Sequence, residues 1–287
     1  MSKHLIGIIG GSGLYAMEGL EIKEEKKIET PFGAPSDAVM LGTMQGQQIA
    51  FLARHARGHL IPPHQINFRA NIYALKTLGV DSIISVSAVG SMKEDIHPGD
   101  IVIVDQFVDR TKVRHQTFFE DGIVAHVSFA DPVCKCLADK LIKSAKNIGA
   151  NVHEKGTYIC IEGPMFSSRA ESHIYRSWGV DVIGMTNYQE AKLAKEAEIC
   201  YATIALSTDY DCWRVGEEAV DVAQVIEVMH KNVETAQKII KDVLSSLSTT
   251  KTCNCNNCLQ NSIMTAPDKI SKATKKRLKP IIDKYIK

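Results

Sequence analysis

The chain has 287 residues, of which 45% are hydrophobic and 23% are charged, an ordinary globular composition with enough length to bury an ample core. Its formal net charge of +1 creates no overall field that would attract nucleic acid or an anionic membrane surface. No apolar run approaches the roughly 20 residues that span a bilayer. Because the N-terminus lacks the pattern of a signal peptide, we expect a cytoplasmic protein with neither nucleic-acid nor membrane partners.

Strand-like and helix-like runs alternate along the chain, which predicts an α/β fold. The expected strands cover residues 5–9, 39–41, 49–52, 83–88, 101–104, 156–161, 180–185 and 199–206. The expected helices cover residues 62–78, 132–148, 169–178, 190–197, 220–247 and 269–285. Residues 105–131 are polar and aromatic without a clear period, which is typical of a long functional excursion.

The strand predicted at residues 199–206 runs directly into two carboxylates, Asp209 and Asp211. In open α/β folds, ligands bind at the carboxyl edge of the sheet, which is where such a strand delivers its last side chains. A paired aspartate at that edge can transfer protons or accept hydrogen bonds from the donor edge of a ring. The alternative is a surface turn whose carboxylates are solvated.

Two segments carry groups that suit an anion. The first strand leads into Gly10-Gly11-Ser12-Gly13, whose backbone N–H groups and Ser12 hydroxyl suit a phosphate, although the glycines alone favour a tight structural turn. The spacing matches neither a dinucleotide fingerprint nor a Walker A loop, so neither cofactor is implied. After another strand, the run RHARGH at residues 54–59 offers in Arg54 a bidentate fork for phosphate, the alternative being a solvated basic loop.

Three further strand ends carry small, hydroxyl or aromatic side chains. Ser87 to Ser91 allows close approach of backbone to a ligand, or is a plain turn. In the loop 162–168, Phe166 suits stacking on a flat ring and Ser167 suits donation, unless Phe166 is a core residue. Thr186 follows Met185 at a helix start, where an N-cap is the alternative role. Together the strand ends describe a site for inorganic phosphate at one end and an aromatic base at the other.

The same residues lie in longer stretches that resemble the methylthioadenosine phosphorylases, in the trimeric branch of the purine nucleoside phosphorylases. The resemblance covers residues from about 5 to about 247, and the stretches occur in order and at family-like spacing. They are GIIGGSGLY, TPFGAPSD, ARHARGH, SAVGS, PGDIVIVDQFVDRT, IEGPMFSSRAES, GMTNYQEAKLAKEAEICYA and STDYDCW. The resemblance implies one domain with a central twisted mixed β-sheet flanked by helices.

The resemblance also implies roles for individual residues. The residues that match phosphate contacts of the family are Ser12, Arg54, His55, Ser87, Ala88 and Thr186. Met185 matches the residue beneath the ribose, Phe166 the one that packs on the purine, and Ser167 and Val222 positions tied to substrate preference. His126 resembles the histidine that a neighbouring subunit lends to the 5′ end of the nucleoside, in a homotrimer or a dimer of trimers.

The implied activity is phosphorolysis of 5′-methylthioadenosine, with inorganic phosphate as co-substrate and with neither cofactor nor metal. Asp209 is the expected acid for N7 of the leaving adenine, and Asp211 the acceptor from its amino group. Phosphorolysis of adenosine or methylthioinosine is the nearest alternative. Hydrolysis of the same bond is another, but it does not use phosphate, so Ser12, Arg54 and His55 speak against it. A non-catalytic nucleoside-binding protein, or an adaptor for metal or nucleic acid that acts through the tail, is the alternative from another class.

Two features depart from the family pattern. Gln189 stands where the family usually has proline at a helix start, and we expect a small effect because glutamine tolerates the same backbone conformation. A Ser/Thr-rich linker separates the phosphorylase domain, residues 1–248, from an extension at 249–287 that we expect to pack on the core. In that extension, Cys253, Cys255 and Cys258 are three thiols, one ligand short of a closed zinc site, and free thiols or a disulfide are the alternatives.

Overall fold

The computed structural model describes residues 4–286 apart from residues 12, 15–16, 215–221 and 248–252, and gives no side-chain description for residues 222–227. Eleven strands within this part of the chain form one sheet. They are β1 (Leu5–Gly10), β2 (Glu21–Lys26), β3 (Val39–Met44), β4 (Gln47–Ala53), β5 (Ser82–Ser91), β6 (Ile101–Ile103), β7 (Gln106–Asp109), β8 (Val152–His153), β9 (Thr157–Cys160), β10 (Val182–Gly184) and β11 (Cys200–Asp209). The helices are α1 (Phe68–Thr77), α2 (Lys135–Asn147), α3 (Arg169–Ser177), α4 (Asn187–Glu196), α5 (Val222–Ser246) and α6 (Lys272–Ile282).

The centre of the sheet is β5, which pairs in parallel with β1 on one side and with β11 on the other. Near its carboxyl end β5 pairs with β10 in the antiparallel sense, so that the sheet is mixed. Every residue of β11 except Asp209 is buried, as the near-continuous apolar run of a strand covered on both faces predicts. The predicted α/β fold with a mixed sheet is therefore confirmed.

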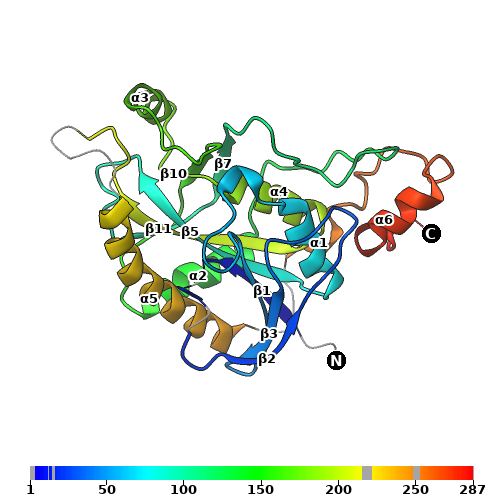
Figure 1. The fold of residues 1–287 in the computed structure, drawn as a ribbon, viewed down its shortest axis with the longest axis horizontal. Helices are drawn as coiled ribbons and strands as arrows, with labels where there is room; N and C mark the ends of the chain where they lie inside the picture. The colour runs from blue at the N-terminus through cyan, green and yellow to red at the C-terminus, as the bar shows by residue number, and fades with distance from the viewer. Residues whose placement is uncertain (1–3, 12, 15–16, 215–221, 248–252, 287) are drawn as a thin grey trace.

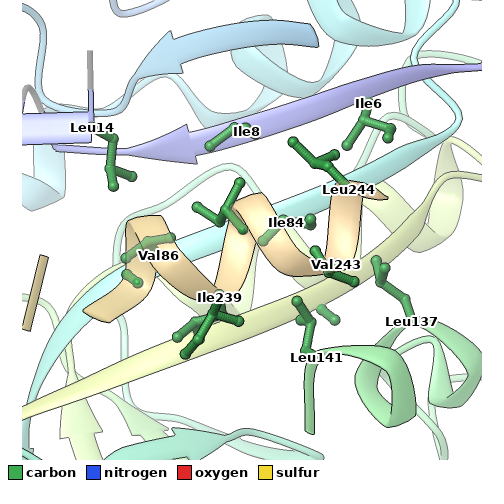
Figure 2. Packing of buried hydrophobic residues seen from close by; sticks show 14 of the residues in the cluster. Ile6, Ile8, Leu14, Ile84, Val86, Leu137, Leu141, Ile239, Val243 and Leu244 are labelled. Atoms are coloured by element: carbon green, nitrogen blue, oxygen red, sulfur yellow. The ribbon is translucent and has the colours of Figure 1, made fainter. Parts of the chain in front are cut away.

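Helices cover both faces of this sheet (Figure 1). On one face α2 and α5 pack against β1, β5 and β11, and Figure 2 shows Ile239, Val243 and Leu244 of α5 directed at the strands. On the other face α1 and α4 lie over the sheet, with α6 beside α1. The apolar faces of the helices thus pack against the apolar side chains of the strands and form two separate core layers, one on each face of the sheet.

Several element boundaries differ from the sequence prediction. Helix α1 begins at Phe68 instead of residue 62, because a 3₁₀ turn over Pro63–Gln65 precedes it and the Asn67 side chain accepts a hydrogen bond from the Ala70 N–H as its cap. Helix α4 begins three residues earlier than predicted, at Asn187. Strand β2 was not predicted, since every one of its residues is exposed and its sequence lacks a buried face.

The described part of the C-terminal segment, residues 253–286, lies against elements distant in sequence. Leu278 and Ile282 of α6 are buried in the same core layer as α1 and α4. The Tyr285 hydroxyl donates to the Glu198 carboxylate across 2.5 Å. A β-bridge joins Ala125 to Ile263, so that this segment also holds the excursion 105–131.

Within the described residues, no helix is both long and apolar enough to cross a membrane.

Candidate active site

An irregularity in β11 sets the position of the two predicted carboxylates. The register between β11 and β5 shifts between Ser207 and Asp209, which places Asp209 opposite Gly90 at the carboxyl end of both strands. Such a bulge redirects the side chains that follow it. The backbone then turns sharply, because Asp211 adopts the left-handed conformation with φ of 51°, which aspartate tolerates better than most residues.

Hydrogen bonds hold the two carboxylates relative to each other. The Asp211 N–H donates to Asp209 Oδ1 across 2.7 Å, and the Thr208 hydroxyl donates to Asp209 Oδ2 across 2.6 Å. Asp211 is only 8% exposed, and burial raises the pKa of its carboxyl above the ordinary value. The pair is therefore a partly dry carboxylate site and not the solvated turn that was its alternative.

A side chain at position 90 would crowd this pair. A Cβ atom at position 90 would lie 2.9 Å from Asp209 Oδ1 and 3.4 Å from Asp211 Cβ. The glycine of the SAVGS stretch therefore permits close approach between β5 and the carboxylates.

Ser87, Ala88 and Thr186 come together from β5 and from the turn between β10 and α4. The Ser87 and Thr186 hydroxyl oxygens lie 3.4 Å apart, and Thr186 is buried. Thr186 occupies the N-cap position of α4, but its side chain makes no capping hydrogen bond, so its hydroxyl is directed to Ser87. Two hydroxyls beside the N-terminus of a ten-residue helix suit an anion.

The Arg54 side chain corrects one expectation. Its guanidinium is 3% exposed and grips the Glu190 carboxylate, with Nε 2.5 Å from Oε1 and Nη2 3.1 Å from Oε2. It also donates to the Val86 carbonyl and the Ser85 hydroxyl. Four of the five guanidinium N–H groups are thus engaged. The bidentate fork predicted for phosphate is held by Glu190 instead, and Arg54 has one N–H left to offer an anion.

His55 is a neutral imidazole in this environment. Burial, followed by the adjacent Arg54 charge, lowers the pKa of His55 to about 4. Its Nδ1 lies 2.8 Å from the Ile61 carbonyl oxygen, which only accepts, so Nδ1 carries the proton. Nε2 is then an acceptor, which suits the hydroxyl of a protonated phosphate.

The loop that carries Phe166 and Ser167 borders the carboxylates. The Cys212 thiol donates to the Ser167 carbonyl across 3.2 Å, which ties this loop to the residue after Asp211. Phe166 is 49% exposed, so the core role that was its alternative is excluded. Near the start of the same loop, Gly163 lies close to the Met185 side chain, which brings Met185 and Phe166 to one region.

Arg114 supports this loop and was not predicted as a site residue. Arg114 donates to the carbonyl oxygens of Glu162 and Met185, across 2.6 Å in each case. It also donates to the Gln189 side chain across 2.9 Å, and Gln189 in turn donates to the Thr111 hydroxyl. Gln189 is the third residue of α4, is fully buried, and makes polar contacts that proline lacks.

One predicted residue stands apart from this group. His126 is exposed and lines a hollow with Lys192, Lys195 and Glu196, at the opposite end of α4 from Thr186. This chain therefore does not place it beside its own carboxylates. Ser12 and the side chain of Val222 lie outside the described residues.

The tail cysteines correct a further expectation. The predicted trio had one ligand too few for a closed metal site. In the structure, Cys253 and Cys255 lie with Cys134 and Cys200, at mutual distances that suit a metal, and Cys258 lies outside this group. Sequence spacing could not predict this grouping, because Cys134 and Cys200 are distant in sequence from the tail cysteines.

The lowered pKa of His55 predicts how stability responds to acid. Between about pH 6.5 and about pH 4 the unfolded chain binds a proton here that the folded chain does not, so stability falls as pH falls through this range. His55→Asn removes the titration and keeps a donor for the Ile61 carbonyl. From pH 7 to pH 5, in phosphate-free buffer, the wild type should lose about 2 kcal/mol more unfolding free energy than the variant. Urea titrations measure this, and parallel losses would contradict it.

Comparison with known proteins agrees with this geometry. Residues 5–245 match the family model described as the Phosphorylase superfamily. The S-methyl-5′-thioadenosine phosphorylase of Koribacter versatilis is 54% identical over 98% of this chain and 96% of the relative. The enzyme of the same name from Geobacter sulfurreducens is 53% identical over 99% of this chain and the whole relative.

Solved structures agree as well. A methylthioadenosine phosphorylase from an antarctic soil metagenomic library has a TM-score of 0.93 and 50% identity, covering 98% of this chain and 99% of the other. The Schistosoma mansoni methylthioadenosine phosphorylase in complex with adenine has a TM-score of 0.87 and 36% identity, covering 92% and 100%. On these grounds the chain belongs to the phosphorylase superfamily.

Proposed function

We propose that this protein catalyses the phosphorolysis of 5′-methylthioadenosine, releasing adenine and 5-methylthioribose 1-phosphate. The observation that carries the proposal is the placement of an anion-suited hydroxyl pair and a carboxylate pair on the same sheet edge. Ser87 marks the hydroxyl pair, and Gly90 lies opposite Asp209 of the carboxylate pair. These two residues are three positions apart on β5, which is about 10 Å along the strand. That separation suits a phosphate at one end and the far edge of a ribose-linked base at the other. Relatives with this name at about half identity over the full chain support the same reaction.

The phosphate end supplies positioning and electrostatic stabilisation. Phosphate oxygens accept hydrogen bonds from Ser87, Thr186 and the N-terminus of α4. The nearby Arg54 guanidinium adds positive charge. A phosphate oxygen attacks C1′ on the face opposite the base, and the bond between C1′ and N9 breaks with its electron pair leaving on adenine. The product is the ribose 1-phosphate with inverted configuration.

The base end handles the charge that leaves with adenine. Asp209 is assigned as the donor of a proton to N7, and Asp211 as the acceptor from the exocyclic amino group. The raised pKa of Asp211 makes it the alternative holder of that proton, so the division of roles between the two is part of the proposal. A carboxylate acceptor at this edge favours 6-amino over 6-oxo purines.

The reaction as proposed uses no cofactor and no metal, since phosphate is the nucleophile and a side chain supplies the proton. We also propose a homotrimer, in which His126 of one subunit meets the 5′ end of the nucleoside held by the next. Its position away from its own carboxylates supports this arrangement. Exposed apolar side chains at Leu60, Val113 and Met165 are surface that such contacts would cover.

A nucleoside panel tests the proposed reaction. Purified protein is incubated with methylthioadenosine, adenosine or methylthioinosine, each with and without phosphate, and the released base is quantified. Methylthioadenosine should give the highest kcat/KM, and omission of phosphate should abolish adenine release. Adenine release that does not depend on phosphate would establish hydrolysis, and preference for methylthioinosine would overturn the assignment of Asp211.

Asparagine variants separate the two carboxylates. Asp209→Asn should fold normally, because the amide oxygen still accepts from the Asp211 N–H while the Thr208 hydroxyl turns to the Val89 carbonyl, 3.2 Å away. An amide has no acidic proton to give, so kcat should fall by roughly 100-fold or more. Asp211→Asn should instead shift preference toward 6-oxo purines. The reverse pattern, with kcat lost only in Asp211→Asn, would exchange the two roles.

Gly90→Ala tests whether the close approach serves the site. The added methyl would press on the end of the Asp209 side chain, which moves at little cost to the fold. Displacing that carboxylate should reduce kcat/KM for methylthioadenosine by the order of 100-fold, with the melting temperature nearly unchanged. A variant with normal activity would show that Asp209 tolerates displacement, whereas a large loss of stability would mark Gly90 as a structural requirement.

A further inference from the structure

Four thiols lie together at the amino end of β11, far from the carboxylates. We call them the four-cysteine cluster; its members are Cys134, Cys200, Cys253 and Cys255. Their Sγ atoms all lie within 4.8 Å of one another. The Cys200 and Cys253 sulfurs are 3.3 Å apart, and each cysteine is a free thiol.

The members of the cluster come from two separate parts of the chain. Cys200 begins β11, and Cys134 immediately precedes α2; the two are buried, and the Cys134 N–H donates to the carbonyl of Tyr201 across 2.8 Å. The other two come from the C-terminal segment and are partly buried against the core layer formed by α2 and α5. The cluster therefore spans the boundary between the core and the tail.

The arrangement meets the geometric needs of a thiophilic ion. Zinc bound by four thiolates is tetrahedral with bonds of about 2.3 Å, which places the sulfurs about 3.8 Å apart. The cluster fits this spacing after small side-chain movements. Cys134 also stands at the N-terminus of a 13-residue helix, where the dipole favours a thiolate.

We propose that the four-cysteine cluster is a structural zinc site that fastens the C-terminal segment to the core. All four coordination positions are filled by protein, which is typical of a structural and not a catalytic zinc. Binding releases the thiol protons and joins Cys253 and Cys255 to α2 and β11 through one ion. Asp209 lies nine positions after Cys200, about 30 Å along the strand, so the ion takes no part in chemistry at the carboxylates.

Disulfides are the competing outcome for the same sulfurs. Pairing within the cluster would join sulfurs at about 2.05 Å and would need an oxidant. A disulfide between Cys253 and Cys255 would close a very small ring and leave the tail unattached to the core. Zinc instead engages all four sulfurs without oxidation, and it explains why two core thiols face two tail thiols.

Metal content and cobalt substitution test the proposal on the full chain. Protein purified without chelator should contain about one zinc per chain by elemental analysis. After chelation under reducing conditions, Co²⁺ should bind with the same stoichiometry and give the intense visible and thiolate charge-transfer absorption of a tetrahedral thiolate site, and Zn²⁺ should displace it. Absence of stoichiometric zinc together with absence of these bands would overturn the proposal. So would a titration, on denatured protein never exposed to reductant, that finds fewer than the eight thiols of the sequence.

Single variants assign the ligands. Cys253→Ser and Cys134→Ser should lose the cobalt bands and the rise in melting temperature that Zn²⁺ gives the wild type. Serine is a favoured cap at position 134, so loss there reports on the metal and not on the start of α2. Cys258→Ser, in the same segment but outside the cluster, should retain both signals. Equal loss in Cys258→Ser would contradict the assignment, and if a cluster variant fails to fold, the wild-type cobalt titration alone decides.

Discussion

The buried ion pair between Arg54 and Glu190 is the interaction on which the site depends. The two side chains are 3% and 1% exposed, and the pair joins the end of β4 to α4 while Ser85 of β5 bonds to both partners. Removing one member of such a pair costs roughly 3–5 kcal/mol, because the other is left charged in a dry interior. Tyr201 of β11 donates to the same carboxylate, and burial raises the pKa of its hydroxyl well above the ordinary value, so it remains a donor. Four elements are therefore tied together beside the Ser87 and Thr186 hydroxyls before any ligand arrives.

Much of this site follows from the ends of strands. An apolar run that stops at a polar residue marks the edge of a sheet, and this rule located Ser87, Thr186 and the two aspartates. The same rule says nothing about pairs of polar residues distant in sequence. Glu190 contacts Arg54 although the two residues are 136 positions apart in sequence. From the local sequence, Glu190 is only a residue that favours a helix. Arg114 lies in an excursion without periodicity, so no pattern indicated that it supports the loop of Phe166 or that Gln189 belongs to the same network.

The elements that sequence reasoning missed share a physical cause. Strand β2 carries no apolar alternation because both its faces meet solvent, and its ladder hydrogen bonds come from the neighbouring β3. Local sequence pattern also could not predict the grouping of the tail cysteines with Cys134 and Cys200, since it depends on where the C-terminal segment packs. Local sequence determines what a segment prefers to be, whereas the choice of neighbours is settled by long-range packing.

The attachment of the tail has a consequence for the order in which the protein is made. Glu198, at the turn before β11, accepts hydrogen bonds from the Leu259 N–H and from the Tyr285 hydroxyl, and Tyr73 of α1 donates to the carbonyl of Arg277. A ribosome delivers these partners after the elements that they contact. The apolar surface that Leu278 and Ile282 cover therefore stays open until these residues have been synthesised, an interval in which a chain with exposed apolar surface is prone to aggregate. A stop codon before Leu259 would yield a chain with an uncovered core, not a shorter enzyme.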